Sequence, residues 1–233
     1  MFKRYAIATL ATSATALFAL AGCAGSQPAG GQSVSGHDGA KAQGDVSSAT
    51  EFVAAASRGL QLDYDKQATP AAAVAASKLI VRGTLVDVTD GITFGGAGAA
   101  QAGRASSYGT AVIEVTAAAK GQAAPGSKVY AIFNKSTVTG AADLATTGRN
   151  LKVVAALADI SNWSPAPGVT VVRPVGMPAN GPLYLAFPDS LWLQGSADKT
   201  MVGVHAEPAD IPAAWGTPKT LDQYWSMLEK AAK

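Results

Sequence analysis

The sequence predicts a mainly β domain, a small antiparallel barrel or sandwich with short N- and C-terminal helices. Short runs rich in Val, Ile and Leu recur along the chain, separated by Gly, Pro and Asn-Gly turn signals. Helix-capping patterns stand at the two ends of this region, at Ser48–Glu51 and at Thr220–Gln223. Strands at roughly regular spacing between terminal helices are typical of a β-barrel or β-sandwich.

The first 22 residues have the layout of a secretory signal peptide. Lys3 and Arg4 form a positively charged start, and no charged residue occurs from Tyr5 to Ala21. The apolar run falls short of the roughly 20 predominantly apolar residues of a membrane-spanning helix, and its Thr and Ser weaken it further. We therefore expect residues 1–22 to be cleaved off and not to remain as a transmembrane anchor.

Cys23, the only cysteine in the chain, follows this run directly. The tetrad Leu20-Ala21-Gly22-Cys23 resembles the lipobox of bacterial lipoproteins. The resemblance implies cleavage between Gly22 and Cys23 and a mature N-terminal cysteine that is N-palmitoylated and carries S-diacylglycerol. Two or three acyl chains make a stable anchor, because each buried methylene contributes roughly 0.8 kcal/mol.

The expected location is therefore the extracytoplasmic side of the cell membrane, with acyl chains on Cys23 as the membrane partner. The alternative is an incidental cysteine after an ordinary signal peptide. Residues 23–49 are dominated by Gly, Ser, Ala and Gln and predict a flexible tether. About 25 such residues reach roughly 25–30 Å. Residues 50–233 then form a single domain.

Charge excludes one class of partner. Removing Lys3 and Arg4 with the signal leaves 16 basic and 16 acidic residues. A net charge near zero gives no electrostatic basis for binding nucleic acid. We expect no nucleic-acid partner, and we expect a monomer whose stability comes from a hydrophobic core, since an intramolecular disulfide needs a second cysteine.

Two helices and a strand open the domain. The first helix follows the capping pattern at Ser48–Glu51 and ends at Arg58-Gly59. Thr69-Pro70 begins a second helix over residues 71–77, because proline suits the first helical position. Leu79–Thr89 is rich in β-branched residues and predicts the first strand, which the Asp90-Gly91 turn ends.

The glycine-rich segment Ile92–Ser107 raises the question of a phosphate-binding loop. It lacks the glycine spacing of the dinucleotide motif and the Gly-Lys-Ser/Thr of the P-loop. A strand follows instead at Tyr108–Thr116, where Ala111, Ile113 and Val115 alternate with polar residues. The segment is therefore interpreted as a long hairpin loop.

Further strands are expected in the second half of the domain. Leu151–Leu157 is also compatible with a helix because it contains several alanines. The closing segment from Thr220 predicts an amphipathic helix with apolar residues at helical spacing. The other expected strands are Lys128–Phe133, Val169–Arg173, Leu183–Phe187, Leu191–Leu193 and Met201–His205.

Three stretches, "AAASKLIVRGTLVDV", "YGTAVIEVTAAAKGQAAPGSKV" and "GPLYLAF", resemble a small OB-type barrel of secreted bacterial proteins and lipoproteins. The resemblance covers Ala71 to His205. It implies an order of strands and turns and no chemistry.

Catalytic chemistry has one candidate in the domain, His205. With only His37 and His205 in the chain, a multi-histidine metal centre is excluded, and we expect no metal and no cofactor. His205-Ala206-Glu207 matches the His-x-Glu of zinc deaminases, but their cysteine ligands are absent. An envelope hydrolase that combines His205 with Asp210 and an unidentified serine remains an alternative, because triads assemble from distant residues.

The tryptophans offer the best indication of binding. Trp163 lies in the loop sequence "ISNWSPAPG", where an exposed indole is costly unless it is used. Trp192 and Trp225 are interpreted as packing residues, and burial is the alternative for each tryptophan. We therefore expect a non-enzymatic binding or adaptor protein of the cell envelope, with Trp163 and His205 as candidate contacts for an envelope protein or small ligand. A structural envelope protein without a ligand is a further alternative.

Overall fold

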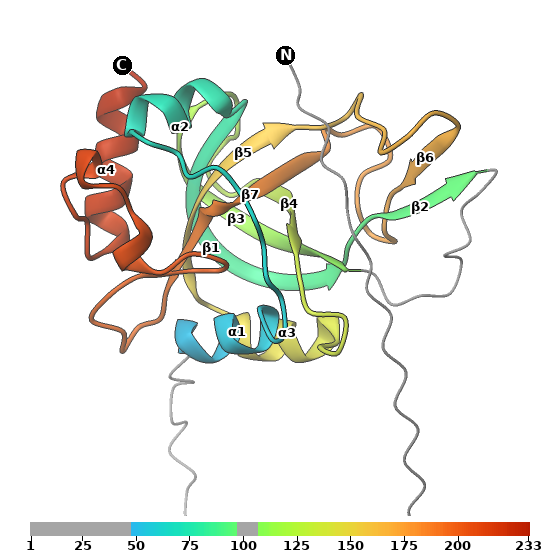
Figure 1. The fold of residues 1–233 in the computed structure, drawn as a ribbon, viewed down its shortest axis with the longest axis horizontal. Helices are drawn as coiled ribbons and strands as arrows, with labels where there is room; N and C mark the ends of the chain where they lie inside the picture. The colour runs from blue at the N-terminus through green and yellow to red at the C-terminus, as the bar shows by residue number, and fades with distance from the viewer. Residues whose placement is uncertain (1–47, 97–106) are drawn as a thin grey trace, which may run out of the picture. The chain divides into compact units, whose positions relative to one another are not determined.

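The computed structural model describes residues 48–96 and 107–233 (Figure 1). Its centre is a closed barrel of five strands, which confirms the predicted mainly β barrel with short terminal helices. The barrel strands are β1 (Leu79–Asp90), β3 (Tyr108–Lys120), β4 (Lys128–Asn134), β5 (Lys152–Asp159) and β7 (Tyr184–Gln194).

The strands follow one another around the barrel in the order β1-β3-β4-β7-β5 and back to β1. All neighbours are antiparallel except β4 and β7, which run parallel and pair Ala131 with Tyr184 and Ile132 with Leu185. This is the arrangement of an OB-type Greek-key barrel. β1 serves two partners, β3 and β5, and three register irregularities against β3 let this long strand curve.

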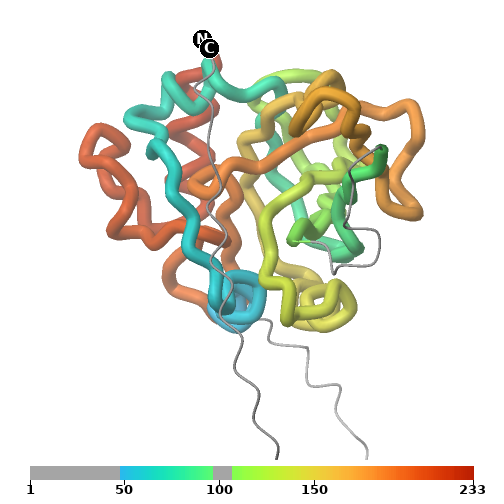
Figure 2. Tube along the Cα trace, turned by 45° about the vertical axis from the view of Figure 1, so that its right-hand side comes forward, coloured from blue at the N-terminus to red at the C-terminus, as the bar shows by residue number. Residues whose placement is uncertain are grey.

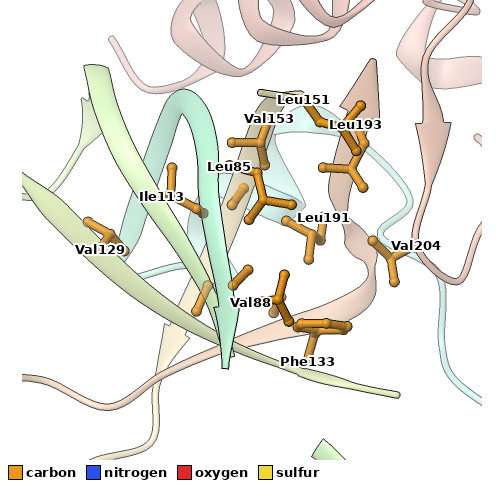
Figure 3. Packing of buried hydrophobic residues seen from close by; sticks show 14 of the residues in the cluster. Leu85, Val88, Ile113, Val129, Phe133, Leu151, Val153, Leu191, Leu193 and Val204 are labelled. Carbon is orange, nitrogen blue, oxygen red and sulfur yellow. The ribbon is translucent and has the colours of Figure 1, made fainter. Parts of the chain in front are cut away.

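The barrel interior is filled by one side-chain face of each strand (Figure 3). Ala111, Ile113 and Val115 point into it, as the alternation in the sequence predicts. At Gly83 the strands approach so closely that a side chain would collide with the backbone carbonyl of Glu114. Glycine is therefore required at this position of β1.

Two helices close one end of the barrel. α1 (Ala49–Ala56) buries Phe52, and α3 (Ala141–Gly148), which the sequence did not predict, buries Leu144. The prediction that the Ser48 side chain caps α1 is wrong, because the Ser48 hydroxyl makes no capping hydrogen bond. The Ala49 N–H donates instead to Asp198 Oδ2 at 3.0 Å.

Two further helices lie against the outer face of the barrel. α2 (Pro70–Ala76) is capped as predicted, since Thr69 Oγ1 accepts from the Ala72 N–H at 3.0 Å. α4 (Leu221–Ala231) begins with the predicted capping box of Thr220 and Gln223. Together with short 3-10 helices at Pro208–Asp210 (η1) and Ala213–Trp215 (η2), they enclose a second apolar cluster outside the barrel.

The glycine-rich connection between β1 and β3 differs from the prediction in one respect. β1 and β3 do form an antiparallel hairpin, but the connection contains a strand of its own, β2 (Thr93–Gly96). β2 pairs with β6 (Val169–Val172), which lies in the connection between β5 and β7. We call β2, β6 and residues 160–183 the arm; Figure 1 shows its two-stranded sheet beside the barrel.

The last barrel strand was expected as two short strands, Leu183–Phe187 and Leu191–Leu193. It is one strand, β7, with an irregularity in its register against β5 that accommodates the residues around Pro188. The expected strand at Met201–His205 is reduced to β8 (Val202–Gly203). Proline within β7 is tolerated because the ladder is interrupted there.

Candidate functional site

Exposed apolar side chains gather on the arm. In the ranges that the structure describes, four large hydrophobic side chains stand exposed, and Trp163, Val172 and Val175 are three of them. Trp163 is 45 % exposed and Val175 is 97 % exposed, whereas Trp192 and Trp225 are buried, as predicted, and so is Trp215. Exposed large apolar side chains within one small element make the arm the candidate interaction site.

Trp163 is held in place by the neighbouring strand. Its ring meets Phe94 of β2 edge to face, with centroids 6.1 Å apart, and Phe94 meets Tyr108 in the same manner at 6.0 Å. The backbone N–H of Trp163 donates to the Ile160 carbonyl at 2.9 Å, which closes a turn. The indole is therefore positioned before any partner arrives.

The arm rests on the barrel through a small cluster of its own. Ile132, on the outward side of β4, is fully buried there together with Ile92 and Leu183. The two connections that build the arm join the first barrel strand to the second and the fourth to the fifth. In OB-type barrels these connections flank the ligand-binding face.

Side-chain hydrogen bonds stabilise two turns of the arm, one after β5 and one after β6. At its base, Asp159 accepts from the Ser161 N–H at 2.9 Å and from its hydroxyl at 2.6 Å, and these bonds hold the Asp159 pKa below its usual value. Ser161 Oγ in turn accepts from the Leu183 N–H at 2.9 Å. Directly after β6, where Val172 pairs with Thr93, the Arg173 guanidinium donates to the carbonyls of Pro178 and Gly181 and so braces the following turn.

His205 lies in different surroundings, where α1, β4 and β8 meet. Its Nε2 is 2.7 Å from the Asn134 carbonyl, and its Nδ1 is 3.1 Å from Ser57 Oγ. Burial lowers the His205 pKa, although the bond to Asn134 opposes this. A carbonyl only accepts, so the neutral ring carries its hydrogen on Nε2 and leaves Nδ1 as an acceptor.

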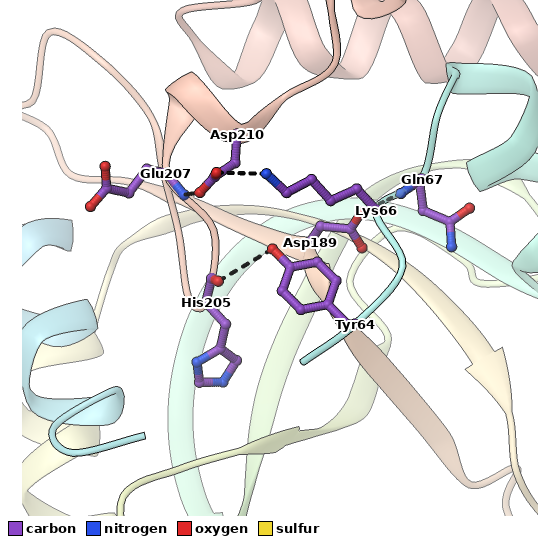
Figure 4. Close-up of polar contacts among 7 residues, drawn as sticks. All are labelled: Tyr64, Lys66, Gln67, Asp189, His205, Glu207 and Asp210. Carbon is purple, nitrogen blue, oxygen red and sulfur yellow. Dashed lines mark hydrogen bonds and ion pairs between the residues drawn. The ribbon is translucent and has the colours of Figure 1, made fainter. Parts of the chain in front are cut away.

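This geometry bears on the hydrolase alternative (Figure 4). A serine does lie beside the ring, but its one hydroxyl hydrogen faces two acceptors, the Val204 carbonyl at 2.5 Å and His205 Nδ1 at 3.1 Å. The expected acid, Asp210, points elsewhere: its carboxylate binds Lys66 Nζ at 2.7 Å and the Glu207 N–H at 3.0 Å. In a catalytic triad the second ring nitrogen of the histidine donates to a carboxylate. Here His205 Nε2 donates to the backbone carbonyl of Asn134 instead.

The two candidate contacts from the sequence are therefore not brought into one site. Trp163 belongs to the arm, whereas His205 ties α1 to the barrel. Phe94, which positions Trp163, was missed, although an aromatic residue within a glycine-rich loop could have drawn notice. Ser57 carries no signal in the sequence. Cys23 and Gly22 lie outside the described residues.

Neither a metal centre nor a membrane-spanning helix is found in the part of the chain that the structure describes. Within residues 48–96 and 107–233, no three His, Cys, Asp or Glu side chains come close enough to share a metal ion. In the same ranges no helix has the length and hydropathy to cross a bilayer.

The barrel topology does not by itself assign an activity, because barrels of this kind carry many unrelated functions. The arm and its exposed side chains are therefore the features that bear on function. Comparison of the chain with protein-family models, with curated proteins and with solved structures gave no match.

Proposed function

We propose that this protein is a lipid-anchored extracytoplasmic binding or adaptor protein that contacts another envelope protein through its arm. The observation that carries the proposal is that the arm contains three of the four exposed large hydrophobic side chains in the described ranges: Trp163, Val172 and Val175. Fully burying a large apolar side chain contributes about 1.5–3 kcal/mol, so a partner that covers Val175 and the exposed halves of Trp163 and Val172 would gain about 3 kcal/mol.

The chemistry of the arm favours an apolar protein surface as the partner. Arg173 is the only charged residue in the sequence from 160 to 183, and its guanidinium is bonded to two carbonyls of the arm itself. Binding to nucleic acid depends on several Lys or Arg contacts with phosphates. Trp and other large apolar side chains, by contrast, dominate the centres of protein interfaces.

The anchoring half of the proposal comes from the sequence. The lipobox-like tetrad ends at Cys23, and the folded domain begins with α1 at Ala49. A glycine- and serine-rich stretch of this length allows the start of the domain to move up to roughly 25–30 Å from its anchor. Mass spectrometry of the mature N-terminal peptide should show an acylated Cys23; an unmodified cysteine or an uncleaved signal would contradict it.

The binding half is tested by site-specific photo-crosslinking in intact cells that make the protein. A photoreactive residue at Val175 should give a discrete crosslinked band, and Trp163→Ala should weaken that band several-fold. The matched control places the same group at Ser226, an exposed position on α4. Equal crosslinking from both positions, or no effect of Trp163→Ala, would contradict a specific surface, and no band at all would favour a structural protein without a ligand.

A further inference from the structure

A small cavity lies beside the segment that joins α1 to α2. This segment, Leu60–Thr69, is called the strap; Figure 2 shows it running from α1 towards α2 on the side of the C-terminal segments. The cavity has a volume of about 10 Å³, and its walls include the rings of Trp192, Trp215 and Tyr224. This is about the space that one water molecule needs.

The three rings form a rigid wall. Trp215 and Tyr224 stack in parallel planes with centroids 4.9 Å apart, and Trp192 meets Tyr224 at 5.5 Å. Both indole N–H groups are already engaged: Trp192 donates to the Asp189 carbonyl and Trp215 to the Gln67 carbonyl, each at 2.8 Å. Neither indole therefore donates to the Asp189 side chain.

Asp189 also lines this cavity, and its carboxylate is only half satisfied. Oδ2 accepts from the Gln67 N–H of the strap at 2.6 Å. Oδ1 is buried without a hydrogen-bond partner, and no other buried side-chain nitrogen or oxygen in the described ranges is left so. A buried acceptor without a donor is costly, and it points to a bound group that would supply one.

No positively charged side chain is bonded to the Asp189 carboxylate in the described residues, so a bound cation could compensate its negative charge. Lys66 on the strap carries a positive charge that acts on Asp189, but its ammonium is bonded to Asp210. Tyr64 and Tyr224 also face Asp189, and its negative charge helps burial to raise the pKa of both phenols, that of Tyr64 to about 12. Burial likewise raises the Asp189 pKa, although the N–H groups of Gln67 and of Asp189 itself and the charge of Lys66 oppose this rise.

We infer that this cavity binds a primary ammonium group, whose N–H donates to Asp189 Oδ1 while the aromatic rings surround the positive charge. Cations are attracted to the faces of Trp and Tyr rings. A quaternary ammonium carries no N–H to donate, and its four carbon substituents take more space around the nitrogen than the three hydrogens of an –NH₃⁺ group do. A hard metal ion needs several oxygen ligands, and within the described residues no three His, Cys, Asp or Glu side chains come close enough to hold one.

Nuclear magnetic resonance of the indole N–H groups tests the inference directly. The full-length chain, labelled with ¹⁵N-tryptophan and purified in detergent, is titrated with ethylammonium chloride. The indole signals of Trp192 and Trp215 should shift in a saturable manner, while Trp163 in the arm is the internal control. Sodium chloride and tetramethylammonium chloride at equal ionic strength should not reproduce the shift. Equal shifts with either salt, or no shift, would overturn the inference and leave a buried water only.

Variants and pH sharpen the test. Asp189→Asn should weaken binding at least tenfold, whereas Asp87→Asn, an exposed aspartate of β1, should not. Binding to the native protein should also weaken as the pH falls and Asp189 becomes protonated, which keeps the inference falsifiable if the variant does not fold. Retained binding in a folded Asp189→Asn protein would overturn it.

The primary ammonium group could belong to a free amine or to the side chain of a peptide lysine. Titration with Nα-acetyl-lysine methylamide, beside ethylammonium, distinguishes these two sources by their relative affinities. The cavity and the arm belong to different apolar clusters, so failure here leaves the proposed role of the arm untouched.

Discussion

Two groups of aromatic residues lie outside the barrel, and they differ in how completely they are covered. In the C-terminal group, Trp192, Trp215, Tyr224 and Trp225 are at most 5 % exposed, whereas Trp163 in the arm is 45 % exposed. The Trp192 and Trp215 indoles of the first group are hydrogen-bonded inside the protein. The same residue type thus stabilises the fold in one place and remains available for contact in the other.

The difference follows from what covers each group. One face of α4 packs against the outward side chains of the barrel strands; this face carries Tyr224, Trp225 and Leu228. Arg82 of β1 adds a cation–π contact, with Cζ 5.2 Å from the centre of the Trp225 ring. The arm has only its own short strands and turns for cover, which bury Ile132 and Leu183 but leave Trp163 half open.

The largest effect is expected from Trp192→Ala, which removes the ring at the centre of the C-terminal group. Loss of its buried contacts and the cavity left behind should lower the free energy of unfolding by about 3–5 kcal/mol. Urea denaturation followed by circular dichroism measures this loss. A loss below about 1 kcal/mol would show that the C-terminal group is not the structural one.

Asp189→Asn should act in the opposite direction at neutral pH. Because burial raises the folded-state pKa of Asp189, the folded protein holds this proton more tightly than the unfolded chain does. Its contribution to stability is therefore present at low pH and lost as the pH rises from the unfolded value, 3.8, through the folded pKa.

Removing this charge should raise the free energy of unfolding at pH 7 by about 1 kcal/mol, since a partly satisfied carboxylate no longer has to be buried in its charged form. The gain should shrink to nothing at pH 3. Denaturation midpoints of both proteins across this pH range, without added amines, provide the measurement. Destabilisation at pH 7 would mean that the carboxylate contributes more through Gln67 than it costs.

The strand positions could largely be predicted from the sequence because they depend on local patterns. The prediction for β1, Leu79–Thr89, misses one residue, since alternating β-branched side chains and the Asp90-Gly91 turn mark it. The closure of the barrel between β4 and β7 could not be predicted, because it pairs Ala131 with Tyr184, far along the chain. α3 carries too few apolar residues to give a helical pattern.

The site residues show the same division. The loop sequence around Trp163 suggested an indole that a partner could use, and its turn is local; its contact with Phe94, by contrast, comes from a distant strand. Asp189 stands in Phe-Pro-Asp-Ser, which is typical of a surface turn; its burial depends on the strap and on Trp192, which come from distant segments. His205 meets Ser57 and Asn134 instead of Asp210 for the same reason.

Trp163→Ala should have a small effect on stability and a large one on contact with partners. Half of the ring is already exposed, so the free energy of unfolding should fall by no more than about 1 kcal/mol. Chemical denaturation of this variant beside Trp192→Ala makes the comparison within one residue type. A loss of several kcal/mol would place Trp163 among the structural tryptophans.

The smallest effect is expected at the exposed ion pair of the strap. Lys66 and Asp210 are 45 % and 42 % exposed, so Lys66→Met should change the free energy of unfolding by no more than about 0.5 kcal/mol. Thermal melting at low and high salt checks this. A larger loss would show that the strap depends on this pair more than on the backbone bonds of Gln67.

Radical footprinting of the tryptophans tests the difference between the two aromatic groups most directly. In the purified protein, Trp163 should oxidise rapidly and Trp192 slowly, because only Trp163 is exposed. In intact cells that make the protein, we expect oxidation of Trp163 to fall several-fold while that of Trp192 stays unchanged. Equal oxidation of Trp163 in cells and in the purified protein would contradict the role of the arm as a binding surface.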